Sequence, residues 1–265
     1  MFVEVFTIQH FTNYLYLGGD PFKAKQINRV AKVFYVVSRA VAALRKYYYP
    51  LRLRLSPKSA RLLPSPTYLP GSSPFRELVF TGRFSFEGRK PDDYRRSLFR
   101  GTYGGNTVLI KFCEGYGEVG HRMLASLGLA PSLHFCSVIL GDVVIVVMDL
   151  VDGQCSYHGF KHQKLPQTVL DDVKHALQVL HAQDLVFGDL RRPNLMVVNS
   201  RGKGEEEQRG LLVDFDWAGK LGKAKYPPGL NISGEIDWAD GAAPDVKIEK
   251  EHDLGMLEKL INGTL

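Results

Sequence analysis

The chain has 265 residues, 45% of them hydrophobic and 11% aromatic, which is enough for a folded core and excludes a globally disordered chain. Three cysteines are too few for a disulfide framework, so we expect an intracellular protein, cytoplasmic or nuclear. No signal peptide is expected, because residues 1–18 have no basic region before an apolar stretch. No transmembrane helix is expected, because the sequence has no run of about eighteen apolar residues. The net charge of +6 is concentrated at the start, where residues 1–64 hold eleven Lys or Arg against Glu4 and Asp20.

Residues 21–49 are predicted to form one helix, with Asp20 as its cap, Pro21 in its first turn and Pro50 as its stop. Apolar residues at steps of three and four form one stripe: Ile27, Val30, Phe34, Val37, Val41, Leu44 and Tyr48. Basic residues at steps of seven line another face: Lys25, Lys32, Arg39 and Lys46. Either the stripe packs on the chain's own domain, or the helix binds an anionic membrane or nucleic acid.

A segment rich in Ser and Pro, residues 55–75, is predicted to be a linker. After it, strands are expected at 78–85, 97–103, 107–112, 133–138 and 143–148, with a helix at 116–127. Gly104-Gly105-Asn106 and Gly141-Asp142 provide turns. Five strands with one helix after the third predict an α+β fold with an antiparallel sheet.

The rest of the chain is predicted to be mainly helical, with helices at 165–183 and 247–262. Two short strands, 195–199 and 210–213, are expected on either side of a polar loop, 200–208. The predicted organisation is therefore an N-terminal extension (1–74), a lobe containing the sheet (75–152) and a short helical lobe (153–265).

Three polar residues have the spacing of a phosphotransfer site. Asp189 follows an apolar run, Asn194 lies five residues later, and Asp214 follows a second apolar run, 211–213. Asp189 could accept the proton of an attacking hydroxyl, and Asn194 and Asp214 offer the hard oxygen ligands that suit Mg²⁺. Arg191 or Arg192 could neutralise a phosphate. Each residue alone would fit a turn or a cap, but their joint spacing after a five-stranded pattern favours a kinase.

Lys111 ends an apolar strand, 108–112, where a lysine of kinases contacts the α- and β-phosphates. Taken alone, it could equally be a solvated charge. Its expected partner is a glutamate on the next helix, and Glu118 is preferred over Glu114.

These motifs resemble the protein-kinase-like superfamily, in its atypical branch with aminoglycoside and choline phosphotransferases. More narrowly, the chain resembles small fungal kinase-like proteins, some of them associated with Crinkler-type effectors. The segments that carry this resemblance are 116–125, 128–131, 147–150, 188–194, 214–220 and 251–254.

The resemblance implies ATP and Mg²⁺ as cofactors, with Asp189 as catalytic base, Asn194 and Asp214 as metal ligands and Lys111 as phosphate clamp. It also implies a hinge that meets adenine, formed by Met148, Asp149, Leu150 and Val151, and a buried Asp253 that anchors the catalytic loop.

The chain departs from the family at several positions. Phe187 stands where a histidine is usual, Gly188 replaces the arginine of His-Arg-Asp, and Asp216 replaces the glycine of Asp-Phe-Gly. The glycine-rich loop is also poorly matched, by Thr81–Ser85 and Phe86–Gly88.

Three functions follow from these observations. The first is an atypical kinase that phosphorylates a hydroxyl of a protein (Ser/Thr) or of a small molecule. The second is a pseudokinase that binds nucleotide or acts as a scaffold without transfer. The third is an adaptor for anionic surfaces or nucleic acid through the basic helix.

Overall fold

The computed structural model describes residues 23–48, 78–84, 97–139, 143–161, 163–201 and 206–263. The chain divides into two compact units, Met1–Leu62 and Leu63–Leu265. Several predicted features lie outside the described residues: Asp20, Pro21, Pro50, the segment 55–75, the turn Gly141-Asp142 and Phe86–Gly88.

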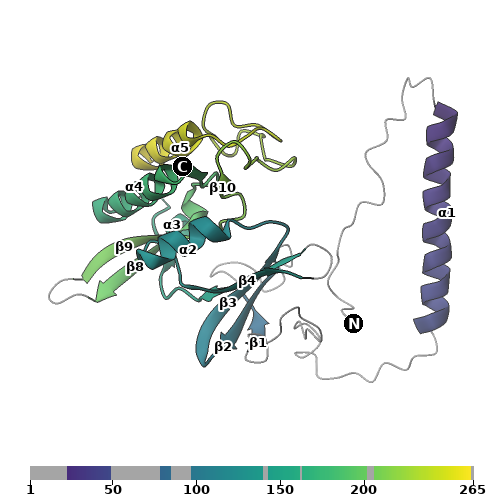
Figure 1. Ribbon diagram of the computed structural model, residues 1–265, viewed down its shortest axis with the longest axis horizontal. Helices are drawn as coiled ribbons and strands as arrows, with labels where there is room; N and C mark the ends of the chain where they lie inside the picture. Colours follow the sequence, from purple (N-terminus) through teal and green to yellow (C-terminus); the bar gives the residue numbers. More distant parts are fainter. Residues whose placement is uncertain are drawn as a thin grey trace. The chain divides into compact units, whose positions relative to one another are not determined.

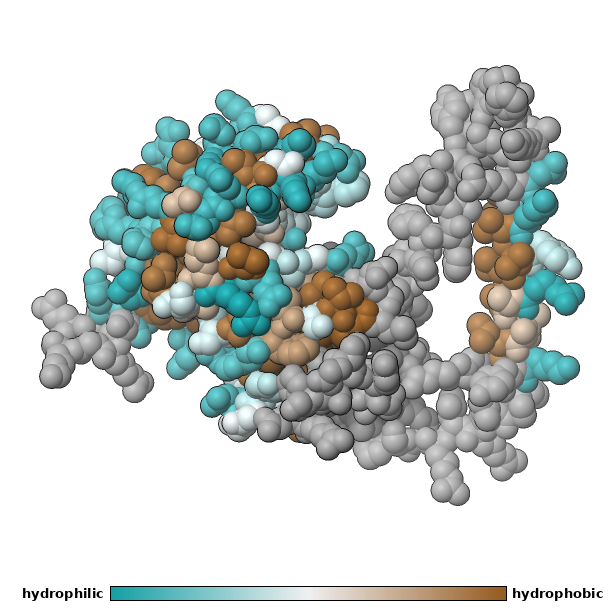
Figure 2. Space-filling view, in the orientation of Figure 1, coloured by the Kyte–Doolittle hydropathy of each residue, from teal (hydrophilic) through white to brown (hydrophobic). Residues whose placement is uncertain are grey.

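The first unit contains helix α1, Lys23–Tyr48, which confirms the predicted helix over the described residues. Its apolar side chains lie along one side, as Figure 2 shows, and Phe34 is 71% exposed. None of its 26 residues is acidic, and Arg45 and Lys46 in the last turn suit the negative end of the helix dipole. No helix in the described part of the chain is long and apolar enough to cross a membrane.

The second unit begins with a five-stranded antiparallel sheet in the order β1-β2-β3-β5-β4 (Figure 1). The strands are β1 (Leu78–Arg83), β2 (Leu98–Tyr103), β3 (Asn106–Cys113), β4 (Leu133–Val138) and β5 (Val144–Asp149). Helix α2, Glu118–Ser126, lies between β3 and β4 in sequence. Gly104 and Gly105 both have positive φ, which explains the tight turn between β2 and β3. The predicted strand and helix order is confirmed.

Strand β5 lies inside the sheet, and its first five residues, Val144–Met148, are all buried. Alternate residues pack on opposite faces. Ile145 and Val147 join Phe99, Val108 and Ile110 on one face, and the other face holds Leu133, Val144, Val146 and Met148. Apolar layers on both faces explain why β5 is a continuous apolar run.

The helical half contains α3 (Ser156–Gly159), α4 (Gln167–Ala182) and α5 (Lys250–Asn262). It also has two small sheets, one formed by β6 (Gln154–Cys155), β8 (Leu195–Arg201) and β9 (Glu206–Leu212), the other by β7 (Leu185–Val186) and β10 (Gly219–Lys220). The predicted loop 200–208 was too long, because the β8–β9 pairing continues as far as Arg201 and Glu206. Strands of two residues, such as β6, β7 and β10, are too short for a periodic sequence signal.

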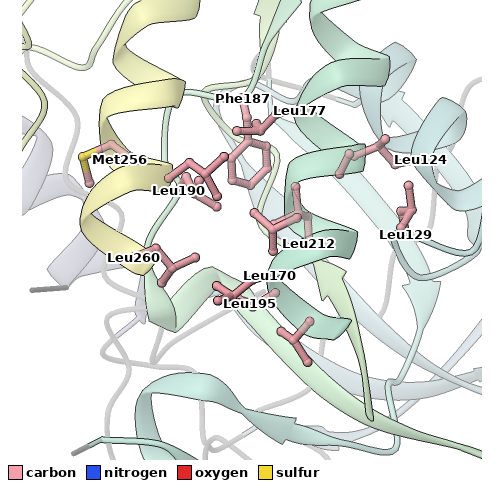
Figure 3. Packing of buried hydrophobic residues seen from close by; sticks show 14 of the residues in the cluster. Leu124, Leu129, Leu170, Leu177, Phe187, Leu190, Leu195, Leu212, Met256 and Leu260 are labelled. Carbon is pink, nitrogen blue, oxygen red and sulfur yellow. The ribbon is translucent and has the colours of Figure 1, made fainter. Parts of the chain in front are cut away.

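The helical half has one large core, which supports the loop between β7 and β8. Phe187 and Leu190 lie between α5, with Met256 and Leu260, and α4, with Leu177 (Figure 3). All five side chains are at most 2% exposed. The predicted α+β arrangement of a five-stranded sheet followed by a mainly helical part is therefore confirmed, and the helical core fixes the loop that carries Asp189.

Candidate phosphotransfer site

The loop that carries Asp189 is hydrogen-bonded to helix α5. The buried carboxylate of Asp253 accepts hydrogen bonds from the backbone N–H groups of Phe187 (2.8 Å) and Gly188 (2.7 Å). His181 Nε2 lies 3.0 Å from the same carboxylate. Asp253 therefore anchors the loop, as the resemblance implied, and satisfies two backbone donors that would otherwise be buried without partners.

The two unusual residues before Asp189 fit the packing around them. Gly188 has a φ of +80°, and a Cβ there would lie 2.6 Å from Ile248 Cδ1. Phe187 is fully buried and meets the ring of Phe215 edge to face, with centroids 5.2 Å apart. Phenylalanine thus replaces a hydrogen-bonding histidine by aromatic packing.

The Asp189 carboxylate is paired with Arg191 through both oxygens, at 2.5 Å (Nε) and 2.8 Å (Nη2). Burial raises the pKa of Asp189, and the Arg191 guanidinium opposes that rise. The same guanidinium lies 5.0 Å from the centre of the Trp238 ring. Arg191 therefore neutralises the candidate base and holds it in one orientation.

Asn194 and Asp214 meet where β8 begins and β9 has just ended. The Val213 N–H donates to the Asn194 carbonyl (3.0 Å), which places Asp214 beside Asn194. Asn194 Nδ2 donates to the Asp189 carbonyl (3.0 Å), so the amide oxygen is the atom that could meet a cation. Asp214 has a φ of +69°, a backbone conformation that few residues other than glycine adopt.

Lys111 reaches this site from strand β3. Its Nζ lies 2.5 Å from Asp214 Oδ1 and 2.6 Å from Asp216 Oδ1. Burial alone would lower the pKa of Lys111, but the two carboxylates outweigh it and the pKa is raised. Burial and the neighbouring Asp214 raise the pKa of Asp216 to about 6. Lys111 is therefore in direct contact with Asp214, and Asn194 connects the Asp189 loop to the strand end that carries Asp214.

The predicted ion pair between Lys111 and Glu118 is wrong. Glu118 instead accepts from Arg122 Nε (2.8 Å), one helical turn further along α2, and Glu114 is exposed. Sequence spacing missed Asp216 as the second partner of Lys111. A signal is present in the sequence, since Asp216 is an acid at a position where the resemblance implies glycine.

Helix α2 and the residue before it contact the segment 214–218 through a backbone hydrogen bond and through stacked aromatic rings. The Gly117 N–H donates to the Phe215 carbonyl (2.8 Å), and the His121 ring stacks on the Phe215 ring with centroids 4.6 Å apart. His121 Nε2 donates to the Pro131 carbonyl (2.8 Å), so Nδ1 accepts from the Tyr116 hydroxyl (2.7 Å). Burial lowers the pKa of His121 to about 4, and the ring is neutral at physiological pH.

The predicted hinge consists of the last two residues of β5, Met148 and Asp149, and the next two, Leu150 and Val151. Met148 is buried, and Asp149 accepts from His134 Nε2 (2.5 Å). The Asp149 and Leu150 N–H groups donate to protein carbonyls, at 3.0 and 3.4 Å. The Val151 N–H is then the next donor along the segment.

Comparison with known proteins finds similarity among solved structures but none in sequence. No known family model matches the chain, and no curated protein matches it. Among solved structures the chain is similar to the kinase PK-1 of Cydia pomonella granulovirus, with 13% identity and a TM-score of 0.47 over 71% of this chain and 69% of that one.

Proposed function

We propose that this protein is an atypical ATP-dependent kinase that transfers the γ-phosphate to a hydroxyl of a protein (Ser/Thr) or of a small molecule. The observation that carries the proposal is the ammonium group of Lys111 between two carboxylates, Asp214 and Asp216, at 2.5 and 2.6 Å. This site is built to hold cationic charge next to a buried, oriented Asp189. Phosphoryl transfer needs this combination of countercharge and position, and little else from the protein.

The donor set fits Mg²⁺. Asp214 supplies a carboxylate oxygen and Asn194 an amide oxygen, both hard ligands from adjoining strand ends. Lys111 would bind the α- and β-phosphates, and Asp189 would take the proton of the acceptor hydroxyl. ATP supplies the transferable phosphoryl group, and the chain supplies position, charge and the base.

The nucleotide base would bind at the hinge formed by Met148, Asp149 and Val151. Since the Asp149 and Leu150 N–H groups are already bonded within the protein, the Val151 N–H is the donor we assign to adenine. The apolar side chain of Met148 would lie beside the ring.

Two measurements test this function. The first is the rise in melting temperature with ATP and Mg²⁺, which binding to the folded state requires. We expect a rise for wild type and none for Asp214→Ala. The second is phosphate transfer, by autophosphorylation or ATP turnover, which we expect Asp189→Asn to reduce at least about a hundredfold because the base is lost. A wild type that does not respond to Mg²⁺ and ATP would contradict the proposal.

The second candidate function is a module that binds nucleotide but transfers no phosphate. It is favoured by the two hydrogen bonds that Arg191 donates to the Asp189 carboxylate. If wild type binds ATP but transfers no phosphate, this candidate replaces the first. Arg191→Ala then tests whether the Arg191–Asp189 ion pair prevents phosphate transfer, because transfer would appear once the Asp189 carboxylate is released.

Helix α1 offers a separate function. We propose that it binds an anionic surface, because it combines seven Lys or Arg and no acidic residue with an exposed apolar stripe. This role does not depend on the phosphotransfer site.

A further inference from the structure

The partner of Lys111 is the feature that sets this site apart. Among the described residues, its ammonium pairs with Asp214 and Asp216, two residues apart on one segment, and not with α2. The side chain of Lys111 is only 13% exposed, so these contacts form in a largely water-free place where a charge-assisted hydrogen bond is strong.

We propose that Asp216 is the residue that positions Lys111 for the nucleotide phosphates, in the role that a glutamate on α2 was expected to fill. The inference rests on the proposed kinase function and adds a positioning residue to it.

Asp214 alone cannot hold Lys111 in the working site. Its carboxylate is the strand-end ligand that the proposed function gives to Mg²⁺, and a bound divalent cation would repel the ammonium group beside it. Lys111 then needs a second carboxylate. Asp216 is already 2.6 Å away and is 70% shielded from solvent.

Glu118 is paired elsewhere in the structure. Arg122 is fixed by two bonds, one to Glu118 (2.8 Å) and one to the Leu133 carbonyl (3.1 Å) on strand β4. The Glu118 carboxylate is 41% exposed and the Arg122 side chain is 48% exposed, so the pair lies at the surface. To reach Lys111, Glu118 would have to break an ion pair that the fold already supports.

The backbone around Asp216 is rigid enough to orient a lysine. On one side, the Gly117 N–H binds the Phe215 carbonyl (2.8 Å), and Gly117 packs so closely that a Cβ would lie 2.5 Å from the Ala218 carbonyl oxygen. On the other side, Gly219 pairs with Val186 in the sheet of β7 and β10. The Asp216 carboxylate therefore projects from a segment held at both ends.

The orientation of Lys111 does not depend on helix α2. With Asp216 as partner, the orientation of Lys111 comes from the same segment that carries the metal ligand. A change in the position of the Glu118 side chain would not alter it.

The test is binding of a fluorescent ATP analogue (MANT-ATP) with Mg²⁺ to the full chain, comparing Asp216→Asn with Glu118→Gln. Asp216→Asn should weaken binding about tenfold or more, as expected for loss of one charge-assisted bond to a buried lysine. Glu118→Gln should remain within about twofold of wild type, since it loses only a surface ion pair. Asp216→Glu, which keeps the charge, should recover part of the loss.

A second comparison separates a direct role from a general loss of structure. In a Lys111→Met background, Asp216→Asn should cause no further loss of affinity, because its effect passes through Lys111. A further tenfold loss in that background would overturn the inference. So would a wild-type affinity in Asp216→Asn together with a large loss in Glu118→Gln. Failure of folded wild type to bind MANT-ATP would instead overturn the proposed function.

Discussion

Gly188 shows how strongly one backbone position constrains the site. Its φ of +80° is costly for alanine, and a Cβ would also meet Ile248 at 2.6 Å. Gly222 makes a matched control, because its φ is +75° but nothing lies within 4 Å of a Cβ there. We expect Gly222→Ala to lower the free energy of unfolding by about 1 kcal/mol and Gly188→Ala by about 2–3 kcal/mol. Equal losses in chemical denaturation would show that the Ile248 contact does not matter.

His121 should make stability depend on pH. Its pKa is about 4 in the folded chain, against 6.5 for the free side chain, because it is buried between Tyr116, Pro131 and Phe215 with Arg122 nearby. The unfolded state therefore takes up the proton first, and stability falls as pH decreases from about 6.5 to about 4. The slope is at most about 1.4 kcal/mol per pH unit.

The measurement is the free energy of unfolding across this pH range for wild type and His121→Gln. The wild type should lose more stability on acidification than the variant, and above pH 7 the difference between them should be constant. His175 on α4 is exposed, so His175→Gln should keep the wild-type slope. A slope unchanged by His121→Gln would contradict the assignment.

At the scale of elements, helices and strands that have a local sequence signal were predicted well, and strand ends that lack one were not. The stripe of α1, the apolar run of β5 and the turn at Gly104-Gly105 each have a local cause, so they can be read from sequence. The extension of β8 and β9 as far as Arg201 and Glu206 depends on cross-strand pairing of polar residues, which has no apolar signal.

The same division applies to the site. Asp189, Asn194 and Asp214 are placed by the strands and the loop that carry them, and their spacing predicted that they meet. The partner of Lys111 is a matter of tertiary geometry, since charge alone does not distinguish the predicted Glu118 or its alternative Glu114 from Asp216. The folded structure shows that Lys111 pairs with Asp214 and Asp216, while Glu118 pairs with Arg122.

Helix α1 carries its own prediction. We expect the full chain to bind vesicles that contain anionic lipid and not to bind vesicles of neutral lipid. Binding to the anionic vesicles should weaken as the salt concentration increases. Lys32→Glu with Arg39→Glu should weaken binding more than tenfold, at about 1 kcal/mol for each charge lost. Phe34→Asp should also weaken it, because the exposed apolar stripe is interrupted.

Lys174 on α4 is exposed, so Lys174→Glu controls for net charge and should keep binding. Vesicle sedimentation measures each variant. Binding to single-stranded DNA but not to vesicles would assign the basic face to nucleic acid. Concentration-dependent self-association without lipid binding would assign the stripe to a second copy of the chain.

At the scale of the second unit, one side chain joins the sheet half to the helical half. The Phe215 ring is fully buried, with the ring of His121 of α2 stacked on one side at 4.6 Å and the ring of Phe187, from the loop that carries Asp189, edge-on at 5.2 Å. Asp214 and Asp216, on either side of it, hold Lys111 of β3. The same three-residue segment therefore positions Lys111, which we propose binds the phosphates, the proposed metal ligand Asp214, and the packing between α2 and the loop.

We expect Phe215→Ala to lower the free energy of unfolding by about 3–5 kcal/mol and to abolish binding of MANT-ATP with Mg²⁺ even where the variant is still folded. Leu260→Ala, in the core of α5 and 2% exposed, should cost about 2–5 kcal/mol but keep binding at temperatures below its melting transition. Chemical denaturation gives the first quantity and fluorescence titration the second. If both variants lose affinity in proportion to stability, Phe215 contributes through the general core. If only Phe215→Ala loses it, the aromatic stack on Phe215 is what aligns the two halves of the site.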